Sequence, residues 1–182
     1  IVIYNYFSGV LKNKIFNNSE SINISKNSNA TIVEYLIDES EGSFFKNTFK
    51  YLNIEEGASL DYYFINKNKS DNFFYEFSKI KLSTNSSFKK YIFSSGVKFS
   101  TFENDVILNG INSNGEVYSG LFLGKDHHQE IKTNIQHLKP SCQSHQDIKN
   151  VLTTGSKGVF QGKIFVDHIA QKTNAYQLSK GL

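Results

Sequence analysis

Residues 22–30 read INISKNSNA, and the same pattern returns as LNIEEGASL at residues 52–60 and as IKLSTNSSF at residues 80–88. Each copy opens with two apolar residues separated by one other, continues with two polar residues and Asn or Gly, and ends with two small residues followed by a hydrophobic or small residue. A looser copy, VILNGINSN, occupies residues 106–114. The copies start at positions 22, 52, 80 and 106, so the intervals are 30, 28 and 26 residues. The chain therefore carries an internal repeat with a period near 28.

An aromatic-rich alternating segment follows each copy, such as TIVEYLI at residue 31, DYYFINK at residue 61 and KKYIFSS at residue 89. A unit of strand, tight polar turn and strand cannot bury its apolar face alone, so successive units must stack on one another. Helical periodicity is scarce throughout the chain. We therefore predict an all-β fold, and we favour a β-helix-like solenoid over a β-sandwich because sandwiches seldom keep so regular a turn chemistry.

The C-terminal stretch, residues 158–182, reads GVFQGKIFVDHIAQKTNAYQLSKGL and spaces its polar residues evenly. Because side chains alternate between the two faces of a strand, this spacing suits one coil of a solenoid. We expect the interior or the turns to hold Ile164, Val166, Ile169 and Ala175, and the solvent or a partner to face Lys163, Asp167, Gln171 and Lys172.

Composition narrows the class of protein. The 182 residues suffice for one domain, and 16 Phe with 10 Tyr can build a core without Trp or Met. All 20 basic residues are Lys and the net charge is only +3, so the Arg contacts that favour nucleic-acid recognition are missing. We expect no nucleic-acid partner.

The sequence also indicates the cellular compartment of the protein and whether the chain is complete. The lone cysteine, Cys142, rules out an internal disulfide, which fits a reducing compartment. The apolar stretch IVIYNYF at residues 1–7 is too short for a membrane-spanning helix and lacks the flanks of a signal peptide. We predict a soluble, cytoplasmic protein without a membrane partner, and the initial Ile suggests that an upstream part is missing.

Potential ligands concentrate in residues 126–145, DHHQEIKTNIQHLKPSCQSH, which hold four of the five His and the single Cys. Imidazole and thiolate groups suit zinc or iron, but these spacings match no tight metal motif. A cysteine nucleophile paired with a histidine is chemically possible, although no orienting partner is visible. No P-loop, G-x-S-x-G elbow or H-E-x-x-H motif occurs. A zinc-dependent or thiol-dependent enzyme is thus the weakest of the readings.

Residues 126–182 resemble the SufB/SufD family of the SUF iron–sulfur cluster assembly machinery, and most closely its SufD branch. The resemblance rests on DHH, on the H-x2-P-x-C-x-S block that contains His137 and Cys142, on GVFQGK at residues 158–163 and on AQKT at residues 170–173. Over residues 1–125 it rests mainly on strand pattern and period.

The resemblance implies a right-handed parallel β-helix. Residues 1–182 would form a single β-helix core domain, truncated at both ends, with the family's N-terminal and C-terminal helical parts outside this stretch. It also implies a non-catalytic scaffold that pairs with a SufB-like paralogue and with a SufC-like ABC ATPase, to which ATP hydrolysis belongs. A nascent iron–sulfur cluster would form in the full complex, and this stretch itself would bind no cofactor.

The resemblance assigns no catalytic or cofactor-binding residue within the chain. His137 and Cys142 match family-like positions, so they are the weak candidates for handling a metal or cluster. Packing or turn formation is the first interpretation of both.

The main alternative is a carbohydrate-binding or adhesive β-solenoid, which would display aromatic stripes and clustered acidic residues on one face. The GVFQGK and AQKT blocks argue against it. A solenoid cut within a coil also exposes strand edges, so we expect the 182-residue chain to be marginally stable or oligomeric on its own.

Overall fold

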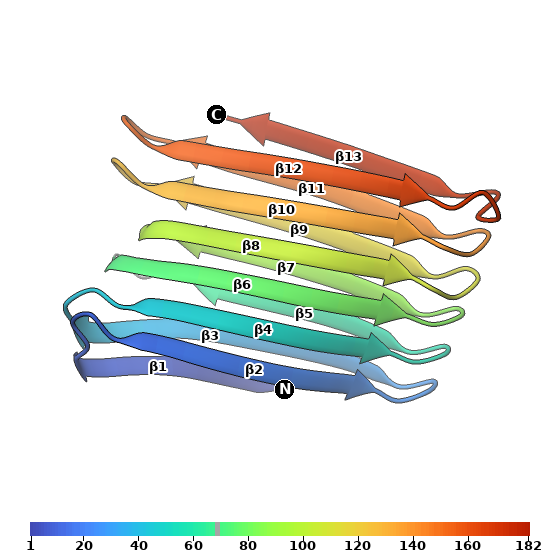
Figure 1. The fold of residues 1–182 in the computed structure, drawn as a ribbon, viewed down its shortest axis with the longest axis horizontal. Helices are drawn as coiled ribbons and strands as arrows, with labels where there is room; N and C mark the ends of the chain where they lie inside the picture. Colours follow the sequence, from blue (N-terminus) through green and yellow to red (C-terminus); the bar gives the residue numbers. More distant parts are fainter. Residues whose placement is uncertain (68–69) are drawn as a thin grey trace.

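The chain coils into a β-solenoid in the computed structural model, which describes residues 1–67 and 70–182. The described part contains thirteen strands and no helix, and hence no helix that could cross a membrane. Figure 1 shows the front strands running left to right and the back strands right to left while the chain climbs, so the coil is right-handed. The predicted all-β, right-handed parallel solenoid is confirmed, and the sandwich alternative is wrong.

Two parallel sheets face each other across the interior, and consecutive strands alternate between them. Sheet A consists of β1 (Val2–Val10), β3 (Asn29–Glu41), β5 (Ser59–Asn66), β7 (Ser87–Ser95), β9 (Asn114–Leu123), β11 (Gln143–Leu152) and β13 (Asn174–Gly181). Sheet B consists of β2 (Ile15–Ile24), β4 (Phe45–Ile54), β6 (Ser70–Leu82), β8 (Val97–Leu108), β10 (His128–His137) and β12 (Lys157–Val166).

The sequence repeat coincides with the coils. Ile22, Leu52, Ile80 and Val106, the first residues of the four copies, are register partners on successive strands of sheet B. The drift of the period from 30 to 26 residues therefore reflects turns of different length between strands that stay in register.

The corner that leads from sheet B to sheet A explains the Asn or Gly in each copy. One residue of every such turn has a positive φ, a conformation that Asn and Gly adopt at the lowest cost. Backbone hydrogen bonds then stack the turns, as when the Asn85 amide donates to the Ile111 carbonyl at 2.8 Å. The residues with positive φ at this corner are Asn27, Gly57, Asn85, Asn112, Ser141 and Lys172.

Apolar side chains fill the interior beside this corner, where Ile54, Leu82 and Leu108 are fully buried and aligned in register. The same alternation reaches the C-terminal coil, where Ile164 pairs with the buried Ile135 and its neighbour Lys163 is exposed. Ile169 lies in the turn before β13, as expected, but its side chain is exposed. Val166 at the end of β12 and Ala175 on β13 are also exposed, so the prediction that these two side chains fill the interior or the turns is wrong.

Candidate functional site

Cys142 lies in a column of small side chains at the corner between the sheets. In each turn the residue after the one with positive φ is small, and Ser86 and Ser113 at this position donate their hydroxyls to the carbonyls of Ser83 and Gly110, respectively. Cys142 occupies the same position in the next coil, with its Sγ 3.2 Å from the Gly110 carbonyl oxygen and 3.3 Å from Ser113 Oγ. The thiol thus occupies the position of the serine hydroxyls in the earlier turns, but it contacts the turn of the preceding coil, and it is fully buried.

His137 ends β10 and points into the interior. Its Nε2 lies 2.9 Å from Ser144 Oγ on β11, and its Nδ1 is buried without a hydrogen-bond partner in the part of the chain that the structure describes. Burial lowers the pKa of His137, so the imidazole is neutral at physiological pH. Cross-sheet packing accounts for this position, and a role of His137 or Cys142 in metal or cluster handling stays a prediction.

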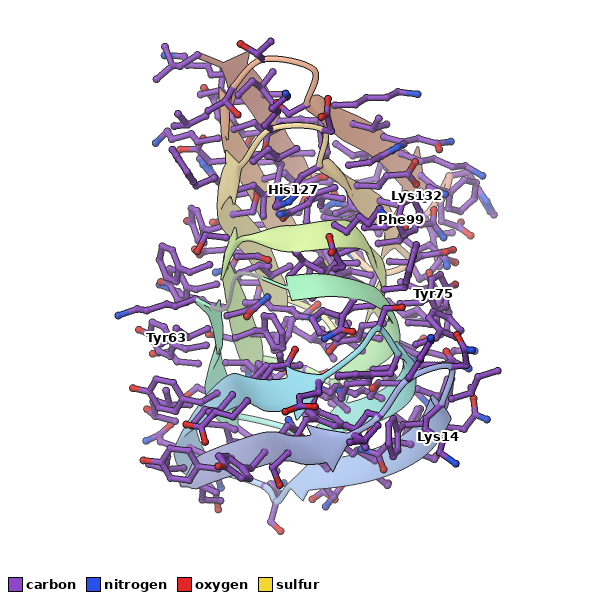
Figure 2. The ribbon with its side chains drawn as sticks, turned by 90° about the vertical axis from the view of Figure 1, so that its left-hand side faces the viewer. Lys14, Tyr63, Tyr75, Phe99, His127 and Lys132 are labelled. Carbon is purple, nitrogen blue, oxygen red and sulfur yellow. The ribbon has the colours of Figure 1, made fainter. Side chains whose placement is uncertain are left out.

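The other histidines of residues 126–145 diverge. His128 lies on the outside of sheet B, 2.8 Å from Glu130 Oε1 and with its ring 5.0 Å from that of Phe99. His145 lies on the outside of sheet A, and Figure 2 shows His127 at the corner between the two sheets. No group of three or more His, Cys, Asp or Glu side chains in residues 1–67 and 70–182 could share a metal ion.

A hollow of about 580 Å³ opens beside His127. Asp71, Ser95, Phe122 and Lys125 line it together with the histidine, so it offers one carboxylate, one ammonium group and one imidazole. These groups make no hydrogen bond with one another in the described structure that would orient a nucleophile or a general base. The hollow is therefore a surface depression without recognisable chemistry.

Sequence reasoning missed the most unusual feature of the molecule, a cluster of charges inside the solenoid. Lys50 Nζ lies 2.9 Å from Glu76 Oε2 and donates to Tyr62 Oη at 2.8 Å. Lys90 Nζ lies 2.6 Å from Glu76 Oε1. Glu34 accepts hydrogen bonds from both Lys50 and Tyr62. All five side chains are buried, and we call them the internal charge cluster.

Electrostatic interactions within the cluster explain how buried side chains remain ionised. Burial alone would raise the pKa of Glu76, but the ammonium groups of Lys50 and Lys90 outweigh burial and lower that pKa strongly. Burial alone would lower the pKa of Lys50, but Glu76 and Glu34 outweigh it and raise that pKa. Burial lowers the pKa of Lys90, an effect that Glu76 offsets only in part. The pair of Lys50 and Glu76 is therefore held ionised.

A polar seam continues from this cluster along the solenoid axis. Lys90 donates to Ser78 Oγ at 2.9 Å and to Asn104 Oδ1 at 2.8 Å, and two coils further on Thr133 donates to Gln146 across the interior. Lys50, Ser78, Asn104 and Thr133 are successive register partners on sheet B. The interior thus has an apolar half next to the sheet-B-to-sheet-A corner and a polar strip beside it.

One sequence signal could have revealed the cluster. Lys89 and Lys90 are adjacent within the strand KKYIFSS, and adjacent strand residues point to opposite faces, so one of the two must point inward.

Comparison with known proteins gives the family. The family model of the SUF system FeS cluster assembly SufBD core domain matches residues 8–182, nearly the whole solenoid, and no curated protein sequence is significantly similar to the chain. The chain belongs to the SufBD core domain family of the SUF iron–sulfur cluster assembly system.

Proposed function

We propose that this chain is a SufD-like scaffold component of the SUF complex, which acts in the cytoplasm with a SufB-like paralogue and a SufC-like ABC ATPase. In this proposal the chain performs no chemistry of its own. The ATPase hydrolyses ATP, and the nascent iron–sulfur cluster is cargo of the whole assembly.

One observation carries the proposal: the SufBD core model covers residues 8–182, which include β2 to β13 and the end of β1. The SufD branch is supported by the GVFQGK block, which lies within β12, and by AQKT in the turn that follows. A continuous stack of parallel strands also suits a scaffold, because backbone hydrogen bonds between neighbouring strands keep the two ends of the solenoid at a fixed distance and orientation.

Ring geometry weakens the carbohydrate-binding alternative. Sheet A does display an aromatic stripe on its outside, as that hypothesis expects. However, Tyr91 stacks between Tyr63 and Tyr118, with ring centroids 4.6 and 5.1 Å away and interplanar angles of 8° and 12°. Sugars bind to the open faces of aromatic rings, and here neighbouring rings cover those faces.

The test is a co-purification. The gene product that contains this chain is tagged and expressed with the SufB-like, SufC-like and any other SufD-like proteins of the same genome. It is expected to retain the SufB-like and SufC-like proteins, and iron and acid-labile sulfide are then quantified in the recovered complex. Recovery of the SufB-like protein in a heteromeric complex supports the SufD-like assignment. Recovery of the ATPase with a SufD-like paralogue instead assigns the SufB branch, and recovery of neither protein refutes the scaffold proposal.

A further inference from the structure

The two outer faces of the solenoid differ in chemistry. Tyr63, Tyr91 and Tyr118 form one register row on the outside of sheet A, and Ile65 and Phe93 form the next. Phe93 and Phe122 are 48% and 50% exposed. We call these two rows, together with Tyr35 and Phe122, the aromatic face; between β3 and β9 they contain no charged side chain.

The outside of sheet B mixes aromatic with charged side chains: Phe45, Phe73 and Phe99 form one register row, and in another Phe49 stacks on Phe77 and is followed by Glu103 and Lys132. Its central row places Tyr51, Lys79, Asp105, Asn134 and Lys163 in succession. Figure 2 shows Tyr63 pointing away from the solenoid on one side, and Tyr75, Phe99 and Lys132 pointing away on the other. On sheet A the aromatic face extends over four strands without a charge. A contiguous apolar patch of this kind marks an interaction surface, and parallel sheets are usually covered on both faces.

We propose that the aromatic face binds a second copy of this chain, face to face, about a two-fold axis that runs parallel to the strands between β5 and β7. Such an axis keeps each residue's position along the strand and reverses the strand order. Tyr63 of one copy then faces Tyr91 of the other, and Ile65 faces Phe93, because these residues are register partners on β5 and β7.

Charge complementarity at the edge of the aromatic face indicates that its partner is a second copy of this chain. Asp61 and Lys89 are register partners beside the tyrosine row. The axis places Asp61 of each copy opposite Lys89 of the other, which creates two reciprocal ion pairs. It also sets the ring of Tyr35 opposite Gly120, a position without a side chain.

The size of the face is consistent with a weak but specific dimer. Strands lie about 4.8 Å apart and outward-facing residues of one strand lie about 6.6 Å apart, so four register rows on the four strands from β3 to β9 cover about 500 Å² of each copy. About 1,000 Å² in total is the lower bound for a biological interface, which predicts a dissociation constant in the micromolar range.

Sedimentation velocity over a concentration series of the 182-residue chain tests the proposal. Phe93→Glu places a charge in the centre of the aromatic face and is expected to weaken dimerisation at least tenfold. Phe49→Glu is the matched control, because Phe49 is a similarly exposed phenylalanine on the outside of sheet B, at 42%. It is expected to leave the dissociation constant within a factor of three, and circular dichroism verifies that both variants fold.

A charge swap tests the geometry. Lys89→Glu places like charges opposite each other and weakens the dimer, whereas Asp61→Lys combined with Lys89→Glu recreates the opposite pairs and restores it. A monomer at 100 µM, or an oligomer that resists Phe93→Glu, overturns the proposal; the latter result would indicate association through the strand edges at the ends of the solenoid. Failure of the double variant to recover affinity refutes the axis.

Discussion

Replacing Glu76 by Gln removes the carboxylate that Lys50 and Lys90 share. Lys50 keeps Glu34 as a partner, but Lys90 is left with only Ser78 and Asn104. At separations of 2.9 and 2.6 Å, each attraction to Glu76 is about 6 kcal/mol for an effective dielectric constant near 20. Desolvation of the three ions offsets most of this, and breaking a buried pair costs about 3–5 kcal/mol net.

The assay is thermal unfolding followed by far-ultraviolet circular dichroism. For a chain of this size, 3–5 kcal/mol corresponds to a fall in Tm of about 6–20 °C. Glu130→Gln is the control, because Glu130 forms an ion pair with Lys132 and a hydrogen bond with His128 on the outside of sheet B, and its loss should cost at most about 1 kcal/mol. The reasoning is refuted if Glu76→Gln lowers Tm no more than Glu130→Gln does.

The pH dependence gives a second readout of the same substitution. Because the folded state lowers the pKa of Glu76 below its ordinary value of 4.5, the resulting stability is present above pH 4.5 and is lost as pH falls below it. Wild-type Tm should therefore drop steeply in acid, and the drop should be shallower in Glu76→Gln, which has no carboxylate to protonate at this position.

Three further outcomes are expected. Cys142→Ser should change Tm by less than about 3 °C, because Ser113 fills the corresponding position one coil earlier, and the native thiol should resist Ellman's reagent until the protein unfolds. Asn85→Ala should cost about 1 kcal/mol and Asn85→Gly less, since the φ of 56° strains any residue with a Cβ, as paired urea titrations would show. Burial lowers the pKa of His137 below 6.5, so its stability contribution is present above pH 6.5 and is lost as pH falls; Tm should decline less between pH 7 and pH 5 in His137→Gln than in the wild type.

The architecture was predictable because turn chemistry and period are local properties. Asn85 and Gly57 mark turns that need a positive φ whatever lies around them, and the apolar residues before each turn fix which side of the strand points inward. The positions of His137 and Cys142 were also predictable in outline, since both fall at a strand end or turn within the repeat.

The orientation of β4 was not predictable from hydrophobicity. In FKNTFKYLNI, a rule that places apolar residues inside would bury Phe45 and Phe49 and expose Lys46 and Lys50. The structure does the opposite: Lys46 and Lys50 are buried, and Phe49 is 42% exposed. Counter-charges such as Glu76 come from other coils, so no window of sequence displays the cluster whole.

The charged side chains favour one register of β4, which explains why they occupy interior positions that apolar side chains could fill. A slip of β4 by one residue would bury Phe45 and Phe49, but it would also expose Leu52 and Ile54, which are buried in the apolar half of the interior. The two halves of the strand thus favour opposite registers, and the ion pairs of Lys50 with Glu34 and Glu76 favour the native one. In the slipped strand Glu34 and Glu76 would remain buried without a cation from β4, at a cost of several kcal/mol. The internal charge cluster therefore acts mainly by fixing the register between the coils, and it adds less to the free energy of unfolding. Glu76→Gln should accordingly broaden the unfolding transition as well as lower its midpoint, because coils that can shift register no longer unfold as one unit.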